Sequence, residues 1–181
     1  MLACDRCETL TRCRSRVVPG DGAVPARIAF VGLAPGRLGG DRTGIPFSGD
    51  RSGILLRQMI RRAGLRDAFI TNLVRCNPRD IRGRNRDPSA AEIANCRSYL
   101  QAELAFARPA VVACLGSVAW RELAGRSAPF TPKQARALRV NGFCLFPLYH
   151  PAYVNRGAYS TSSYLNDFRR LAKVLKTSRR H

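Results

Sequence analysis

The sequence predicts an α/β fold in which helices cover both faces of a parallel sheet. The first observation is a set of four short apolar runs rich in β-formers, at Ile28–Gly32, Phe69–Val74, Ala110–Leu115 and Phe143–Tyr149. The second is a set of segments with helical periodicity between and after these runs, at Ser52–Ala63, Ser89–Ala107, Ser117–Leu123 and Ser162–Leu175. Strands that alternate with helices form parallel sheets, whose ligands bind beyond the carboxyl ends of the strands.

The helices are predicted from their apolar faces and their caps. The first helical segment places Ile54, Leu55, Met59 and Ile60 at helical spacing. The second begins with a capping box, in which Glu92 follows Ser89 by three residues. The sequence has no internal repeat or linker, so we expect residues 1–181 to form a single domain with a basic tail from about residue 176 to 181.

The composition is that of a globular protein with an exceptional positive charge. Thirty-one Lys and Arg stand against twelve Asp and Glu, which gives a net charge of +19. Clustered guanidinium groups bind phosphates, so nucleic acid is the expected partner. A GC-rich genome would explain the preference for Arg over Lys, but it explains the shortage of acids less well.

The cysteines suggest a metal site. No apolar run approaches the roughly twenty residues that span a membrane, and the first residues do not form a signal peptide, so we expect a cytoplasmic protein with reduced thiols and no membrane partner. Cys4 and Cys7 form a tight C-x-x-C pair, and Cys76 and Cys96 a wider pair. Four thiolates would suit zinc or an iron–sulfur cluster. Cys13 is a fifth candidate, whereas Cys114 and Cys144 fall within predicted strands and should be buried.

A glycine-rich loop, 32-GLAPGRLGGDRTGIPFSGDRSG-53, follows the first predicted strand. It contains neither the Gly-Lys-Ser/Thr of a P-loop nor the GxGxxG of a dinucleotide site, so its glycines are expected to admit a flat ligand rather than phosphates. Phe47 would stack on that ligand or pack in the core. Asp41 is a candidate catalytic acid or a turn residue, and Asp50 is expected to cap the following helix.

Two further polar side chains are expected at strand ends. Asn72 carries an amide that can donate and accept together, which suits the edge of a base, although a strand-end hydrogen bond is the simpler interpretation. His150 follows the fourth apolar run and precedes Pro151, where it could be structural or functional. The basic segment Asn77–Asp87 is expected to be a surface loop.

In combination, these motifs resemble the uracil-DNA glycosylase superfamily, specifically its iron–sulfur branches. The resemblance rests on GLAPG with DRTGIPFSGDRSG, the pair Cys4 and Cys7, TNLVRC at 71–76, ANC at 94–96 and LYHPAY at 148–153. It covers nearly the whole chain and is most similar to type B (family 5), with a relation to type A (family 4). It implies a three-layer α/β/α sandwich with a central four-stranded parallel sheet, and a [4Fe–4S] cluster on Cys4, Cys7, Cys76 and Cys96.

The resemblance also implies a DNA repair enzyme, acting as a monomer in a prokaryotic nucleoid, that flips uracil from DNA and hydrolyses its N-glycosidic bond. Asp41 and His150 would be catalytic, and the base would contact Gly32, Leu33, Ala34, Phe47 and Asn72. DNA would contact Tyr153, Val154, Arg156, Arg82 and Arg84, with Tyr153 or Val154 as the wedge that replaces the flipped base. Type B similarity would extend the substrates to hypoxanthine, xanthine or thymine.

The chain departs from the family pattern at three places. Leu33 stands where type A enzymes have Glu, which shifts the catalytic role onto Asp41. Ala152 replaces the serine of His-Pro-Ser, and the basic insertion of the covalently reacting branch is missing. Two alternatives stay open, namely a catalytically weak relative that binds uracil or abasic DNA and a zinc-containing nucleic-acid-binding protein.

Overall fold

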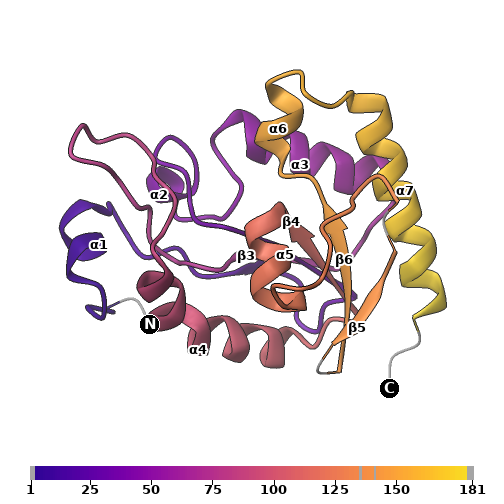
Figure 1. Ribbon diagram of the computed structural model, residues 1–181, viewed down its shortest axis with the longest axis horizontal. Coiled ribbons are helices and arrows are strands. Elements are labelled where there is room, and N and C mark those ends of the chain that lie inside the picture. Colours follow the sequence, from indigo (N-terminus) through magenta and orange to yellow (C-terminus); the bar gives the residue numbers. More distant parts are fainter. Residues whose placement is uncertain (1–2, 135, 141, 179–181) are drawn as a thin grey trace.

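The central four strands of the sheet are parallel, as the sequence predicts, and helices pack on both faces (Figure 1). The computed structural model describes residues 3–134, 136–140 and 142–178. The strands run in the order β1-β3-β2-β4-β6-β5. Their bounds are β1 Asp21–Gly22, β2 Ile28–Gly32, β3 Ala68–Asn72, β4 Val111–Leu115, β5 Leu138–Val140 and β6 Phe143–Leu148.

The predicted count of four strands is wrong, because β1 and β5 add an antiparallel strand at each edge of the sheet. Both residues of β1 are exposed, and β5 has only three residues, two of them exposed. Such short edge strands carry no apolar run from which they could be predicted. The α/β class and the parallel core are confirmed.

The helices are α1 Glu8–Cys13, α2 Gly40–Thr43, α3 Arg51–Arg62, α4 Ala90–Ala107, α5 Ser117–Ala124, α6 Pro151–Asn155 and α7 Thr161–Thr177. The four predicted helices are α3, α4, α5 and α7. The capping box of α4 is present, and the carboxylate of Asp50 accepts the Gly53 N–H at 2.8 Å to cap α3. On α3, Ile54 is 57% exposed although its predicted apolar-face partners are buried. The predicted tail begins inside α7 at Lys176, and its last residues, 179–181, lie outside the described residues.

Alternate residues of the strands face two hydrophobic cores. Phe30, Ile70 and Phe146 pack with α3 and α7, whereas Val31, Phe69 and Leu145 pack with residues of α1, α4 and α5. This alternation follows from the two-residue period of a strand. In the described part of the chain, no helix is both long and apolar enough to cross a membrane.

The strand register brings the functional loops together. Gly32 at the end of β2 pairs with Asn72 at the end of β3, and Leu115 at the end of β4 pairs with Leu148 at the end of β6. The residues that follow these ends therefore meet at one edge of the sheet.

Candidate functional site

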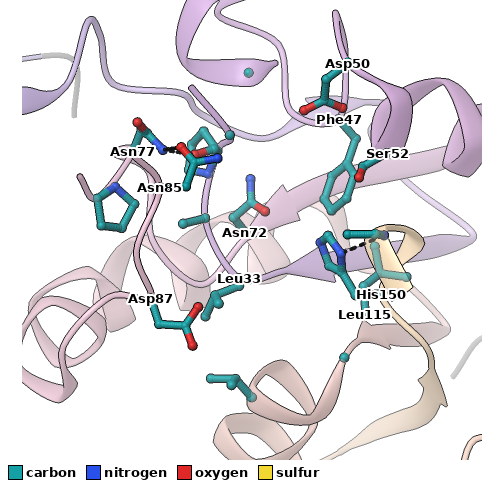
Figure 2. Close-up of a pocket in the computed structure, with 18 of the residues that line it drawn as sticks. Leu33, Phe47, Asp50, Ser52, Asn72, Asn77, Asn85, Asp87, Leu115 and His150 are labelled. Carbon is teal, nitrogen blue, oxygen red and sulfur yellow. Dashed lines mark hydrogen bonds between the residues drawn. The ribbon is translucent and has the colours of Figure 1, made fainter. Parts of the chain in front are cut away.

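A cavity of about 510 Å³ lies at the carboxyl edge of the parallel strands (Figure 2). Each of the four parallel strands contributes to it, through Leu33 after β2, Asn72 in β3, Leu115 in β4 and His150 after β6. Figure 2 shows Phe47, Asp50 and His150 on one side and the loop residues Asn77, Asn85 and Asp87 on the other. The predicted base-binding residues Leu33, Ala34, Phe47 and Asn72 all line the cavity.

The amide of Asn72 is nearly enclosed, yet part of it is unpaired. The residue is 2% exposed, and its Oδ1 atom has no hydrogen-bond partner among the described residues. A buried polar atom without a partner is costly, and it marks a place where a ligand can complete the hydrogen bonding. The expected strand-end hydrogen bond of this amide oxygen is therefore not formed.

Gly32 makes room for the residues that line the cavity and does not itself line it. A Cβ atom at Gly32 would lie 2.5 Å from Asn72 Oδ1 and 2.5 Å from Phe47 Cζ. Any larger residue would displace the amide or the ring. A glycine is thus required here because the side chains of Asn72 and Phe47 approach its backbone closely.

Phe47 both packs in the core and lines the cavity, so the two interpretations of this ring are compatible. Its backbone has φ of 50°, in the left-handed region that is unfavourable for a side chain of this size. Arg57 holds this conformation by donating from Nε to the Phe47 carbonyl at 2.8 Å and from Nη2 to the Pro46 carbonyl at 2.9 Å. Sequence reasoning missed Arg57, because nothing in the local pattern of α3 indicates which loop its guanidinium reaches.

His150 is the N-cap of α6, and its ring is oriented by that role. Its Nδ1 atom accepts the Ala152 N–H at 3.2 Å, so a neutral imidazole carries its proton on Nε2. Burial, opposed by the charge of Asp50 and reinforced by that of Arg156, lowers the pKa of His150 to about 4. The ring is therefore a neutral donor at physiological pH.

The two acids of the glycine loop occupy different environments. Asp41 is fully buried, accepts the Ser15 N–H at 3.0 Å, forms an ion pair with Arg79, and does not line the cavity. Its position therefore does not support a direct catalytic role. Asp50 lines the cavity while capping α3, and its charge acts on His150.

Asn77 connects the loop that follows β3 to the glycine loop. This amide is 1% exposed and donates to the Pro35 carbonyl at 2.7 Å and to Asn85 Oδ1 at 2.9 Å. It also accepts from Arg79 Nε at 2.8 Å, and Arg79 is the partner of Asp41. The buried Asp41 carboxylate thus supports one wall of the cavity through Arg79 and Asn77. The predicted surface loop is in part a buried wall, which the polar composition of Asn77–Asp87 does not suggest.

The structure places the four predicted cluster ligands near one another. Burial raises the pKa of Cys76, and the charges of Cys96 and Cys4 add to this effect. Burial likewise raises the pKa of Cys96, with contributions from the charges of Cys7 and Cys4. Within the described residues, no three His, Cys, Asp or Glu side chains are arranged to hold a single metal ion. The predicted burial of Cys114 and Cys144 is confirmed.

Two of the four sulfurs accept a hydrogen bond from a side chain. Arg14 Nη1 lies 3.2 Å from Cys76 Sγ, and Asn95 Nδ2 lies 3.4 Å from Cys7 Sγ. The backbone N–H of Arg75 approaches Cys96, and the hydroxyl of Tyr99 approaches Cys4. Cys13 differs, because its thiol contacts the carbonyl oxygens of Leu10 and Asn77.

The predicted DNA contacts divide into exposed and buried residues. Arg156, Arg82 and Arg84 are exposed, and Arg156 lines the cavity. Val154 is only 6% exposed and packs in the core beside α3, so the prediction that it could act as a wedge is wrong. Tyr153 is 37% exposed and stacks on Tyr149 at a centroid distance of 4.9 Å.

Comparison with known proteins agrees with this architecture. The family model of the Uracil DNA glycosylase superfamily matches residues 19–175. A type-4 uracil-DNA glycosylase of Archaeoglobus fulgidus is 33% identical over 96% of this chain and 89% of its own length. A type-5 uracil-DNA glycosylase of Pyrobaculum aerophilum is 33% identical over 95% of this chain and 89% of its own length. A type-5 uracil-DNA glycosylase of Mycobacterium leprae is 35% identical over 88% of this chain and 78% of its own length. The chain therefore belongs to the uracil-DNA glycosylase superfamily.

Proposed function

We propose that this protein excises uracil from DNA. The observation that carries the proposal is the unpaired amide of Asn72, which faces a cavity bordered by the ring of Phe47 and the imidazole of His150. Relatives of both types are named uracil-DNA glycosylases, which supports the same reaction here.

The base is recognised by its edge and its face. The N3–H and O4 of uracil are an adjacent donor and acceptor, which one amide can match with Oδ1 and Nδ2. Phe47 offers an aromatic face for stacking, since its ring borders the cavity. The cavity is reached only by a base outside the helix, so the nucleotide must be flipped. Hypoxanthine, xanthine and thymine are further candidate substrates.

His150 stabilises the leaving base. As the bond between C1′ and N1 breaks, its electron pair passes to the base and negative charge develops on O2. The Nε2–H of a neutral His150 can donate to that oxygen, because Nδ1 is already occupied by the Ala152 N–H. A donor that is fixed at a helix N-terminus needs no reorientation during the reaction.

Asp50 supplies the negative charge near the sugar. The departing base leaves an oxocarbenium-like sugar, which a carboxylate can stabilise while it orients the attacking water. Asp50 lines the cavity while its Oδ1 atom caps α3. Water adds to C1′ and its released proton goes to the uracil anion, which gives free uracil and an abasic site. Asp41 serves as a positioning residue through its ion pair with Arg79.

Cys4, Cys7, Cys76 and Cys96 would hold the [4Fe–4S] cluster implied by the iron–sulfur branches. The donor set fits, because the four thiols lie close enough to influence one another's pKa and the sulfurs of Cys76 and Cys7 accept hydrogen bonds, which tune cluster thiolates. A cluster with several irons would not require three cysteines to converge on one ion. We propose that the cluster would tie the N-terminal segment to α4 and to the loop after β3. We also propose that this protein binds uracil-containing DNA.

A labelled duplex with a single uracil tests the proposed function. Incubation with the protein followed by alkaline cleavage should yield one shorter strand, whereas a thymine control duplex stays intact or reacts far more slowly. If excess protein gives no abasic product from single- or double-stranded substrate, uracil excision is not its activity. Binding without cleavage would favour the catalytically weak relative instead.

A further inference from the structure

Ile81 is the most exposed large hydrophobic side chain of the described residues, at 103% of its reference surface. The next are Phe106 at 67% and Leu38 at 60%. A fully exposed isoleucine at a loop tip gains no stabilisation from apolar contact. The exposure is informative because Ile81 lies in the basic sequence Arg79–Arg86, where polar residues would be expected.

The tip that carries Ile81 is an ordered turn. Asp80 Oδ1 accepts the N–H groups of Arg82 at 2.9 Å and Arg84 at 2.8 Å. The Asp80 N–H donates to the Arg84 carbonyl at 2.9 Å, and Gly83, with φ of +71°, donates to the Asp80 carbonyl at 2.9 Å. These bonds close the turn below Ile81 and hold its side chain outward.

The turn stands at the rim of the proposed base cavity. Residues on both limbs of the loop line the cavity, namely Asn77, Pro78, Asn85, Arg86 and Asp87. An antiparallel bridge joins Arg79 to Asn85. Ile81 is two residues beyond this bridge, at most about 7 Å along the chain. In Figure 1 the loop between β3 and α4 extends past α2, while α6 stands at the other end of the same edge.

The residues expected to act as a wedge are less suitable. Val154 is buried, and Tyr153 lies against Tyr149 with an interplanar angle of 21°. Releasing Tyr153 would cost its aromatic contact. Ile81 has no such contact to lose, since its side chain is fully exposed.

We propose that Ile81 inserts into the DNA duplex and occupies the space left by the flipped nucleotide. This inference rests on the proposed function, since only a flipped base creates that space. An apolar side chain between base pairs replaces part of the lost stacking, and Arg82 and Arg84 on either side of Gly83 are placed to contact the adjacent phosphates. The wedge thereby favours the extrahelical base in a duplex and has no role in a single strand.

The substitution Ile81→Ala tests the wedge without disturbing the fold, because the side chain contacts no core residue. We expect the single-turnover excision rate to fall about tenfold on double-stranded uracil DNA, since unstacking one step costs a few kcal/mol. The rate on the single-stranded substrate should stay within about twofold. Ile81→Leu should retain the native ratio, and Phe106→Ala, which removes an exposed ring from α4, is the matched control.

A fluorescence measurement tests insertion without relying on turnover. A 2-aminopurine next to the uracil brightens when it is unstacked, so the native protein should brighten it in a duplex and Ile81→Ala should not. Equal brightening by both proteins, or an equal loss of rate on both substrates, would overturn the wedge. If the native protein excises uracil from neither substrate, the proposed function fails, and the fluorescence alone decides whether Ile81 inserts.

Discussion

The rings of Phe47 and His150 lie 5.7 Å apart between centroids, with an interplanar angle of 44°. Phe47 comes from the loop after β2, and His150 from the start of α6. A base that stacks beside Phe47 therefore brings its edge close to the imidazole, so the proposed stacking contact and the proposed leaving-group donor act on one ligand.

The amide of Asn72 should contribute to activity and not to stability. For Asn72→Ala we expect kcat/KM for uracil excision to fall about 30- to 150-fold, because two hydrogen bonds of about 1 to 1.5 kcal/mol each are lost. The Tm should not fall, since the native amide oxygen is buried without a partner. Asn77→Ala is the matched control, because its amide makes three hydrogen bonds and its loss should lower the free energy of unfolding by about 1 to 3 kcal/mol. A large fall in Tm for Asn72→Ala would contradict the prediction.

The imidazole of His150 should stay neutral down to about pH 4. The native pKa lies below the ordinary value of 6.5, so the unfolded chain takes up a proton between these two values and the native protein does not. The free energy of unfolding should therefore decrease as the pH falls from about 6.5 to about 4, and His150→Gln should remove this part of the slope. The chain has two histidines, so NMR titration can identify the low pKa by the resonance that His150→Gln removes. A native pKa near 6.5 would contradict the proposed neutral donor.

The two acids of the glycine loop should respond differently to neutralisation. Asp50→Asn keeps a helix-capping side chain but removes the charge, so we expect the single-turnover excision rate to fall about 100-fold with little loss of stability. Asp41→Asn leaves Arg79 without its buried partner, so we expect a loss of about 2 to 3 kcal/mol in the free energy of unfolding. The folded Asp41→Asn protein should excise uracil within a few-fold of the native rate at low temperature. The reverse pattern would return the catalytic role to Asp41.

Arg57 should act on the substrate through Phe47. Arg57→Met removes two hydrogen bonds to the Pro46 and Phe47 carbonyls and frees a ring that is held at an unfavourable φ. We expect weaker substrate binding, seen as a several-fold increase in KM with a smaller change in kcat. Arg57→Lys should not rescue the effect, because one ammonium group cannot reproduce the bidentate contact. Arg61→Met, at an exposed position of the same helix, should leave both constants unchanged.

Substitution of a proposed cluster ligand should remove iron, whereas substitution of another cysteine should not. The protein purified without oxygen should be brown and contain about four irons. Cys76→Ser should lose iron and destabilise the N-terminal segment, whereas Cys13→Ser and Cys114→Ser should retain it. A colourless protein with stoichiometric zinc would favour the zinc-containing alternative.

The sequence alone determined those features that depend on local pattern. Apolar runs located the four parallel strands, the pair Ser89 and Glu92 located the start of α4, and strand-end position singled out Asn72 and His150. The tertiary structure alone decided which polar side chains reach the cavity. Asp41 and Asp50 are nine residues apart in one loop, yet the first is buried against Arg79 and the second lines the cavity. Val154, a predicted wedge residue, is likewise buried in the core. The physical reason is that burial and side-chain direction depend on long-range partners, such as Arg79 for Asp41 and Arg57 for Phe47, which local periodicity does not encode.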